Sequence, residues 1–383
     1  MFTWIKVAAV VGVSVASLLA QQSQFDPASS FKISFPKDSP VTLVSVDVGS
    51  SRATARGGAV VLDLNSGLLL RNSSGKQIRG VCLLILAQNF TPGGRGSVAA
   101  PALDVAPGEN FPVRIDLRLL RPAVQGEGPL VQVLLDGVLF DDLSFYGENR
   151  LNSRRSLTIW ELESRRDRKH FRQLLEKDGV DALGLEMLAL RTRIANRPRL
   201  DVQIVRRGNL PKSAQAPATV FEPQRNVQFS FLRMPDAPVE LTGGTAIVAG
   251  NEAKAPTVQV ENRQGKAIRH LELGWAVHAA SGGEFLAGMV PADVKLAPHG
   301  KTQVLDEAAL RLNSRSGSQL VIDSMLGFVH LVEYADGQYW IPSRAALQDP
   351  RLARLVPPSP EEQRLLELYR KNGLKALVED LRK

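Results

Sequence analysis

The sequence predicts a mainly β chain with helices, arranged as two tandem antiparallel β-sandwiches that are each followed by a short helical pair. Two observations support this prediction. A ten-residue stretch occurs nearly twice, as RNSSGKQIRG at 71–80 and as ENRQGKAIRH at 261–270. Around each copy, short apolar runs alternate with turn residues, without the regular strand–helix alternation that indicates a parallel sheet.

The repeated stretch predicts a β-hairpin. Asn at its start and Gly three residues later suit a type I turn followed by a left-handed residue, which is a common four-residue hairpin connection. After this turn, VCLLILAQ from Val81 and LELGWAV from Leu271 have the composition of strands. The stretch therefore recurs because the hairpin that it closes recurs.

The similarity between the two halves extends beyond the hairpin. Three further pairs of segments match in the same order: ISFPKDSPVTL (33–43) with FSFLRMPDAPVEL (229–241), VAPGENFPVRIDL (105–117) with LAPHGKTQVLDEA (296–308), and LLEKDGVDALGLEML (174–188) with LYRKNGLKALVEDL (368–381). Four landmarks in one order indicate a tandem duplication.

The duplication predicts the domain boundaries. From the N-terminus we expect a signal peptide at 1–20, sandwich repeat 1 at 28–162, helical pair 1 at 163–200, a Pro- and Ala-rich linker at 208–224, sandwich repeat 2 at 225–345 and a C-terminal helical pair at 359–383. In the last pair, Ser359 and Glu362 have the spacing of a capping box, and Pro360 suits the first helical turn. Gly179 and Gly373 are expected to end the first helix of each pair.

The first twenty residues predict export. Lys6 precedes an apolar run from Val7 to Ala20 with small residues near its end, which is typical of a secretory signal. Cleavage is expected after Ala20, with Ser17 as the rival site; an uncleaved segment would be an N-terminal anchor. No other stretch is apolar for long enough to cross a bilayer. We therefore expect a periplasmic or extracellular protein, whose single cysteine, Cys82, cannot form an intramolecular disulfide.

The positive charge is concentrated in one segment. The net charge is +8, and fifteen Lys and Arg against eight Asp and Glu lie between Arg150 and Arg207. One interpretation is a solvated face in an arginine-rich protein; the other is contact with an anionic envelope component. Nucleic acid is not expected, because no aromatic stacking platform interleaves the cations. The candidate contact residues are Arg154, Arg155, Arg165, Arg166, Arg168, Lys169 and Arg172.

The strand after the first hairpin is apolar on both faces. Val81, Leu83, Ile85 and Ala87 match Leu271, Leu273, Trp275 and Val277, and these two sets are expected to face the cores. On the opposite face, repeat 1 has Cys82, Leu84 and Leu86 where repeat 2 has polar residues such as Glu272 and His278. We expect this face to be covered, either by the chain's own helices or loops or by a protein partner or second copy.

The sequence contains no pattern that identifies catalytic residues, metal ligands or a cofactor. None of the five histidines has a ligand spacing, and no nucleophile elbow or phosphate loop is present. Asp141 and Asp142 are adjacent on a strand, so their carboxylates would point to opposite faces. What the two repeats share is Asn, Gly, Pro, cations and apolar positions, which are structural.

The shared turn also supports a resemblance. Asn72, Gly75, Lys76 and Ile78, repeated at 262–268, form an Asn-x-x-Gly-Lys-x-Ile pattern that leads into a strand. This pattern resembles the immunoglobulin-like sandwich domains of exported bacterial proteins and is similar to those called FxLYD domains. The resemblance covers the hairpin and its flanking strands. It implies that both sandwiches are immunoglobulin-like and that the family contributes no catalytic residues.

These observations favour an exported, non-catalytic scaffold or binding protein of the bacterial cell envelope, acting through its sandwich and helix surfaces. The alternative is a carbohydrate-active or other hydrolase with a dispersed site. A third interpretation is an anchored envelope-assembly factor. The ligand, the partner and the oligomeric state do not follow from the sequence.

Overall fold

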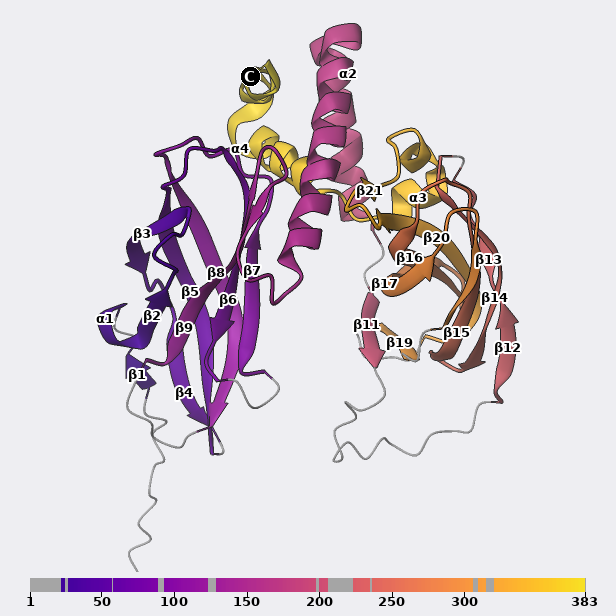
Figure 1. Ribbon diagram of the computed structural model, residues 1–383, viewed down its shortest axis with the longest axis horizontal. Helices are drawn as coiled ribbons and strands as arrows, with labels where there is room; N and C mark the ends of the chain where they lie inside the picture. Colours follow the sequence, from indigo (N-terminus) through magenta and orange to yellow (C-terminus); the bar gives the residue numbers. More distant parts are fainter. Residues whose placement is uncertain are drawn as a thin grey trace, which may run out of the picture. The chain divides into compact units, whose positions relative to one another are not determined.

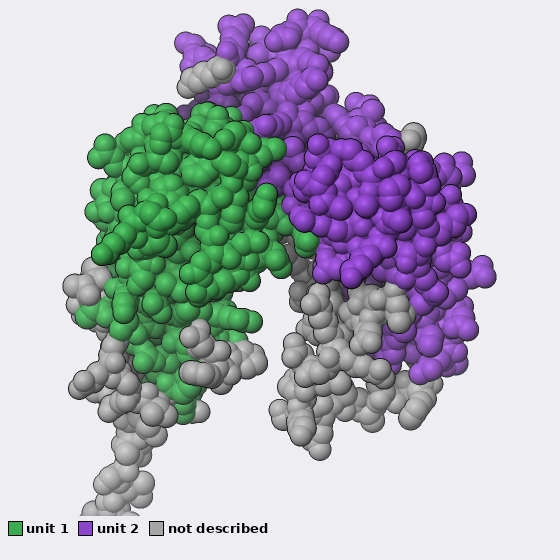
Figure 2. All heavy atoms as spheres, in the orientation of Figure 1, with its two compact units in different colours: residues 1–157 green, residues 158–383 purple. Residues whose placement is uncertain are grey.

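The computed structural model describes residues 22–382 apart from 25–26, 57, 89–92, 123–128, 198–199, 206–222, 235, 306–308 and 315–319. The chain divides into two compact units, Met1–Leu157 (unit 1) and Thr158–Lys383 (unit 2), which Figure 2 shows in green and purple. Each unit contains two β-sheets around an apolar core of its own (Figure 1). The predicted fold class, mainly β with sandwich-like sheets and helices, is confirmed; the immunoglobulin type of these sheets remains a prediction.

Unit 1 has two five-stranded sheets. The first contains, in order, β1 (Gln22–Gln24), β4 (Arg52–Arg56), β5 (Ala59–Asn72) and β3 (Val41–Asp47), with β8 (Asn110–Pro122) also on β5. The second contains, in order, β10 (Phe145–Tyr146), β9 (Val131–Phe140), β6 (Ile78–Leu86) and β7 (Arg95–Ala100), with β2 (Phe31–Ser34) also on β9. A short helix, α1 (Pro27–Ser30), precedes β2.

The core of unit 1 lies between these sheets. Val81, Leu83 and Ile85 of β6 are completely buried in it, as predicted from the alternation of apolar residues. β5 and β8 contribute side chains from the opposite sheet, among them Leu70 and Ile115, which are also fully buried. Burying one such side chain stabilises the folded state by about 1.5–3 kcal/mol. This gain determines which face of each strand points inward.

Unit 2 has a six-stranded and a five-stranded sheet. The first contains, in order, β11 (Leu200–Val205), β19 (Ala309–Ser314), β15 (Glu252–Asn262), β14 (Val239–Ala249) and β12 (Arg225–Gln228), with β18 (Lys301–Leu305) also on β15. The second contains, in order, β13 (Ser230–Phe231), β20 (Ile322–Tyr334), β16 (Ile268–Ala279) and β17 (Glu284–Leu296), with β21 (Tyr339–Trp340) also on β20.

The β16 strand confirms the predicted inward set of repeat 2. Leu271, Leu273, Trp275 and Val277 all belong to the core between the two sheets of unit 2. The other face of this second sheet is covered by α3 (Pro350–Leu355), whose Leu352 and Leu355 are buried against sheet residues. Helix α3 follows a short 3-10 helix, η1 (Ala346–Gln348).

In each unit, two consecutive strands pair with different sheets. In unit 1, β1 pairs with β4 in the first sheet, and β2 then pairs parallel to β9 in the second. In unit 2, β12 pairs with β14 in the first sheet, and β13 then pairs parallel to β20 in the second. The two units therefore share this topological feature as well as the hairpin.

The repeated turn makes the same hydrogen bonds in both units. Asn72 Nδ2 donates to the carbonyls of Lys76 (2.8 Å) and Val105 (3.1 Å), and Asn262 Nδ2 donates to those of Lys266 (2.8 Å) and Ala297 (2.9 Å). Both asparagines are buried. An asparagine that satisfies buried carbonyls in this way fixes the turn, which explains its presence in both copies.

The lysine of each turn also has equivalent partners. Lys76 Nζ lies 2.6 Å from Asp142 Oδ2 and over the ring of Phe140, and Lys266 Nζ lies 2.9 Å from Asp336 Oδ2 and over the ring of Tyr334. Each distance from Nζ to the ring centroid is 5.6 Å, within the range of a cation–π contact. The turn lysine thus has a local structural role in both units.

Two long helices, each broken at a glycine, lie outside the sandwiches. α2 (Ser153–Ala195) is interrupted at Gly179 (φ 84°) and α4 (Pro360–Arg382) at Gly373 (φ 80°), so each is a helical pair, as predicted. The part of α2 in unit 2 and α4 share one apolar core, which includes Phe171, Leu183, Met187, Leu365, Leu377 and Leu381. We call residues 158–195 together with α4 the helix module.

The sequence predicted a helical pair after each sandwich but not the partner on which each pair packs. The pair that follows repeat 1 packs on the C-terminal pair, within unit 2. The apolar stripes of the two pairs are equivalent in sequence, so either could pack on the other. Within the described residues, no helix is both long and apolar enough to span a membrane.

Some predicted domain boundaries differ from those in the structure. The first helical pair covers Ser153–Ala195 rather than 163–200, and residue 200, its predicted end, is the first residue of strand β11. β12 begins at Arg225 and α4 covers 360–382, both close to the prediction. The predicted signal peptide (1–20) and nearly all of the predicted linker (208–224) lie outside the described residues.

Candidate functional site on the helix module

A network of ion pairs joins the two helices of the module. Asp167 of α2 is fully buried, and Arg166 donates hydrogen bonds of 2.9 and 2.8 Å to its two carboxylate oxygens. Arg344, between β21 and η1, donates to Glu362 at 2.6 Å and to Asp167 at 3.4 Å. One guanidinium therefore links a buried carboxylate of α2 to one of α4.

Glu362 also caps α4. Its backbone N–H donates to Ser359 Oγ at 3.1 Å, and the Ser359 N–H donates to Glu362 Oε2 at 3.1 Å, which is the predicted capping box. Arg193, near the end of α2, donates to the other carboxylate oxygen at 2.8 Å. The cap of α4 is thus fixed by cations from two other segments.

A second group of pairs surrounds Glu361. This carboxylate is fully buried and accepts hydrogen bonds from Arg168 of α2 (2.9 Å) and Arg364 of α4 (2.8 Å). Arg364 also donates to Asp380 at 2.6 Å. Removing one partner from a buried pair leaves an uncompensated charge, which typically costs about 3–5 kcal/mol. These residues therefore hold the module together.

Each unit has a β-bulge at an equivalent place in its second sheet, and the extra residue at the bulge is polar in both. Between β6 and β9 the register shifts so that Asp136 is the extra residue, and between β16 and β20 the extra residue is His330. Asp136 accepts hydrogen bonds from the Arg150 N–H (2.8 Å) and from Ser153 Oγ (2.6 Å), which fixes the start of α2. A bulge re-aims one side chain, and both units use it at this position.

In unit 2 the residue at the bulge, His330, belongs to a cluster of ionisable side chains. Burial, together with the nearby Arg166 guanidinium, lowers the pKa of His330 to about 4, and its Nδ1 has no hydrogen-bond partner among the described residues. Burial raises the pKa of Glu163 to about 7, and Arg166 acts against this rise, while Asp167, Glu362 and Glu272 reinforce it. A carboxyl group with such a pKa can exchange a proton near neutral pH.

The predicted basic residues divide between the two units. Arg154 and Arg155 lie in unit 1, in the first turn of α2, and the remaining five lie in unit 2. The side chains of Arg166 and Arg168 are only 14% and 16% exposed because they pair with Asp167 and Glu361. The prediction did not include this pairing, which engages both guanidinium groups inside the module.

Four of the predicted cations line a hollow on α2. The hollow has a volume of about 400 Å³ and is lined by Arg165, Arg168, Lys169, Arg172, Gln173 and Glu176. Their spacing of three and four residues places them on one face of the helix. Arg165 is 43% exposed and donates to Glu161 at 2.7 Å, and Lys169 is exposed. We call this feature the basic hollow.

The predicted apolar face of β6 is largely buried. Cys82 and Leu84 are 5% and 7% exposed, and Leu86 is partly buried. The Cys82 thiol lies against Ser153 at the start of α2, and burial raises its pKa to about 12, with the Asp136 charge acting in the same direction. Leu84 lines a small pocket of about 240 Å³ with Phe35 and Glu148. The chain itself therefore covers Cys82.

The acidic half of the ion-pair network was not predicted from the sequence. Asp167 lies four residues before Phe171, and Glu361 lies four residues before Leu365, so each carboxylate shares a helix face with a core residue. This four-residue spacing from a core residue could have indicated that the two carboxylates are buried. Within the described part of the chain, no group of three or more His, Cys, Asp or Glu side chains could hold a metal ion.

Comparisons with known proteins add little. No protein-family model matches the chain, and no curated protein matches it. Among solved structures, a crystal structure of red sea bream transglutaminase is similar at 9% identity and a TM-score of 0.13. The match covers 80% of this chain and 31% of that one, so the chain spans less than a third of its length. A likeness this low carries no argument about fold or function.

Proposed function

We propose that this chain is an exported, non-catalytic scaffold or binding protein of the bacterial cell envelope that acts through its sandwich and helix surfaces. The observation that supports the proposal best is the basic hollow of α2, where Arg165, Lys169 and Arg172 lie together with Glu176 as the one lining carboxylate. Its partner would be an anionic envelope component. A signal peptide at 1–20, as predicted, would bring the chain to the periplasm or the cell surface.

The expected strength of this contact follows from its charge. Each cation close to an acidic lipid surface contributes about 1 kcal/mol at moderate ionic strength. Three cations acting together would therefore strengthen binding on the order of 100-fold, and the effect would decrease as salt is added. The side chains of Arg166 and Arg168 are only 14% and 16% exposed, whereas that of Arg165 is 43% exposed, so replacement of Arg166 or Arg168 would test the stability of the module rather than this contact.

The proposal is tested by co-sedimentation with vesicles that contain anionic lipid. We expect the variant Arg165→Ala, Lys169→Ala, Arg172→Ala to lose most of its binding, and the wild-type chain to lose binding as salt rises. The matched control is Arg370→Ala, Lys371→Ala, Lys375→Ala, which removes the same charge from exposed positions of α4. Equal retention of the two triple variants would reject the basic hollow as the contact.

One observation favours the alternative of a hydrolase. Glu163 has a pKa of about 7, which is suited to a general acid, and Arg166 and Glu272 lie near it. A screen of the mature chain against glycoside and ester substrates would test this alternative. Activity that disappears in Glu163→Gln while the variant remains folded would replace the non-catalytic proposal.

A further inference from the structure

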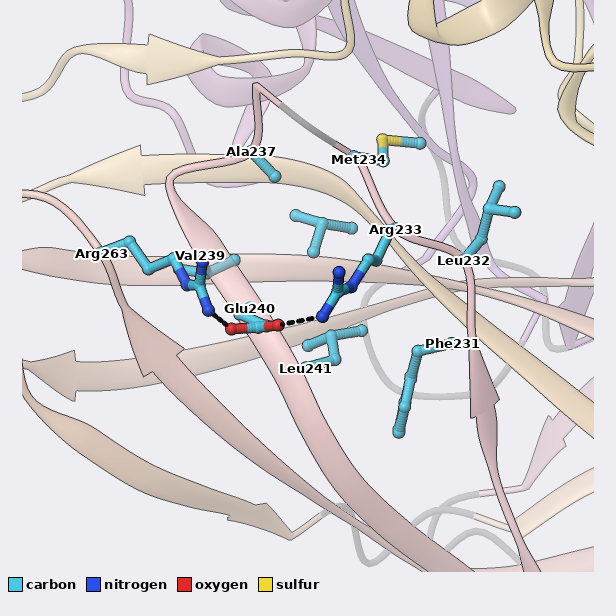
Figure 3. Close-up of a pocket in the computed structure, with 10 residues that line it drawn as sticks. Phe231, Leu232, Arg233, Met234, Ala237, Val239, Glu240, Leu241 and Arg263 are labelled. Carbon is cyan, nitrogen blue, oxygen red and sulfur yellow. Dashed lines mark hydrogen bonds and ion pairs between the residues drawn. The ribbon is translucent and has the colours of Figure 1, made fainter.

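Unit 2 has a pocket of about 260 Å³ beside the start of β14 (Figure 3). It lies where the chain, having left β13, returns to the first sheet of the unit. Most of its lining is apolar: Phe231, Leu232, Met234, Ala237, Val239, Leu241 and Val329. Three charged residues, Arg233, Glu240 and Arg263, complete it. Its size suits one aliphatic or aromatic side chain.

The strand that borders this pocket has an open edge. β15 pairs with β14 from Val239 onward, whereas β12 reaches only Thr245–Val248 on the other side. The Arg263 N–H donates to the Pro238 carbonyl and the Asn262 N–H donates away from β14, to Gly300. Alternation along the ladder then directs the N–H and C=O of Val239 and Leu241 to the open side. No strand of the described residues pairs with them there.

At the equivalent edge in unit 1, one hydroxyl group satisfies the backbone of Val41. Val41 pairs with Asn72 as Val239 pairs with Asn262. Ser39 Oγ donates to the Val41 carbonyl at 2.7 Å and accepts from the Val41 N–H at 3.2 Å. In the matching segments DSPV and DAPV, the position of Ser39 is taken by Ala237. Unit 2 therefore lacks the group that satisfies this backbone, and the alanine methyl lines the pocket instead.

The charges at the pocket leave an excess of positive charge. Figure 3 shows the Glu240 carboxylate between the guanidinium groups of Arg233 and Arg263. Arg233 Nη2 lies 3.5 Å from Glu240 Oε1, and the Arg233 side chain is 89% exposed. Two guanidinium groups share one carboxylate, so a second carboxylate from a ligand would complement them.

We propose that this edge of unit 2 docks an extended segment of a partner protein. The segment adds a strand to Val239–Leu241, inserts an apolar side chain into the pocket and places a carboxylate against Arg233 and Arg263. Main-chain hydrogen bonds supply affinity in this mode of recognition, and the pocket and the charge supply specificity. The proposal does not depend on the basic hollow, which lies on α2.

The probe is a pool of fluorescent hexapeptides of the form Thr-x-Thr-x-Thr-Asp, in which x is Val, Ile, Leu or Phe, titrated into the full chain. We expect binding with a Kd on the order of 10–100 μM. Ala237→Ser should weaken binding about tenfold, because its hydroxyl would occupy the backbone groups as Ser39 does in unit 1. Ala280→Ser, at an exposed position of the same unit, controls for the added hydroxyl and should bind like the wild type.

A second pool ending in Asn tests the charge. The Asp pool should bind more tightly than the Asn pool, and Arg233→Ala with Arg263→Ala should remove that difference. Amide exchange checks the geometry without any ligand: the Val239 N–H should exchange faster than the Val41 N–H in the wild type and become protected in Ala237→Ser.

Several results would overturn the proposal. One is the absence of binding by the Asp pool at about 1 mM. Another is equal binding to the wild type and Ala237→Ser. A third is protection of Val239 and Leu241 that appears without peptide as the protein concentration rises, because that result would assign the edge to a second copy of this chain.

Discussion

Burial determines the protonation of several ionisable side chains in this chain. Glu163 and Glu176 lie on the same helix, yet the pKa of Glu163 is raised to about 7 by burial, whereas Glu176 lines an open hollow. His330 is affected in the opposite sense, since burial favours its neutral form. The helix surface therefore contains both solvated and desolvated ionisable groups within a few turns.

This difference predicts a pH dependence for Glu163→Gln. The folded-state pKa of Glu163 (about 7) lies above its ordinary value of 4.5, so the folded state keeps a proton that the unfolded state releases. The wild type should therefore lose stability as pH rises from about 4.5 through 7, and the variant should not lose this contribution. We expect the variant to gain on the order of 1–3 kcal/mol relative to the wild type between about pH 5 and pH 8.

Urea unfolding of the wild type and Glu163→Gln at about pH 5 and pH 8 measures this gain in stability. His330 contributes with the opposite sign, because its pKa falls from 6.5 to about 4 and stability then rises with pH in that window. It is present in both proteins and cancels in the comparison. Glu176→Gln is the control and should follow the wild type. Parallel curves for Glu163→Gln and the wild type would contradict the assigned pKa shift.

At this scale the sequence allowed some residue roles to be predicted and not others. Asn72, Asn262, Ser359 and Glu362 were assigned correctly, because turn and cap roles depend on neighbours in the chain. The pairing of Arg166 with Asp167 and of Arg168 with Glu361 was not predicted. Their partners depend on how the chain packs, and a list of charges in order does not contain that information.

At the scale of elements, the helical breaks at Gly179 and Gly373 are the best-defined local features. Both glycines have φ near 80°, a region that residues with a Cβ rarely adopt. A Cβ added at either position would meet no heavy atom within 4 Å, so the backbone conformation alone accounts for the glycine. The same break in both helices supports their common origin.

Substitution of these glycines tests that explanation. Gly179→Ala and Gly373→Ala should each destabilise unit 2 by about 1–2 kcal/mol, because alanine is strained at positive φ. Gly184→Ala is the matched control within α2: its Cβ would lie 3.6 Å from Leu374 Cδ2, an ordinary contact, and alanine favours the helix by up to about 1 kcal/mol.

Thermal and urea unfolding followed by helical circular dichroism provide the measurement. We expect the free energy of unfolding to fall in Gly179→Ala and Gly373→Ala and to rise in Gly184→Ala. If Gly179→Ala were as stable as Gly184→Ala, the helix would be continuous at 179, and the account of two helical pairs would be wrong.

Element types were predicted better than element partners. The hairpins, the inward faces of β6 and β16 and both helical pairs follow from hydrophobic periodicity and turn residues. The packing of α2 on α4 did not follow, because Phe171 and Leu365 occupy equivalent positions on equivalent stripes. Periodicity defines which face of a helix is buried, and it does not define which neighbour buries it.

At the scale of the whole molecule, the two units share a polar framework. The equivalent asparagines, lysines, bulges and sheet-changing strands occur in the same order in both. The units differ at equivalent positions such as Ser39 and Ala237, or Asp136 and His330; in unit 2, Ala237 lines the pocket and His330 lies near Arg166. We infer that a common module was duplicated and that its copies then acquired different surfaces.

The most direct test of this account is hydrogen exchange by mass spectrometry on Asn72→Ala and Asn262→Ala. Each substitution removes two hydrogen bonds that the asparagine amide donates to backbone carbonyls and one that its oxygen accepts from a backbone N–H of the turn. This loss should lower the opening free energy of its own unit by about 1–3 kcal/mol and leave the other unit unchanged. Similar, confined losses in both variants are the predicted result. A neutral effect in either variant, or a loss that spreads equally through both units, would contradict the duplicated framework.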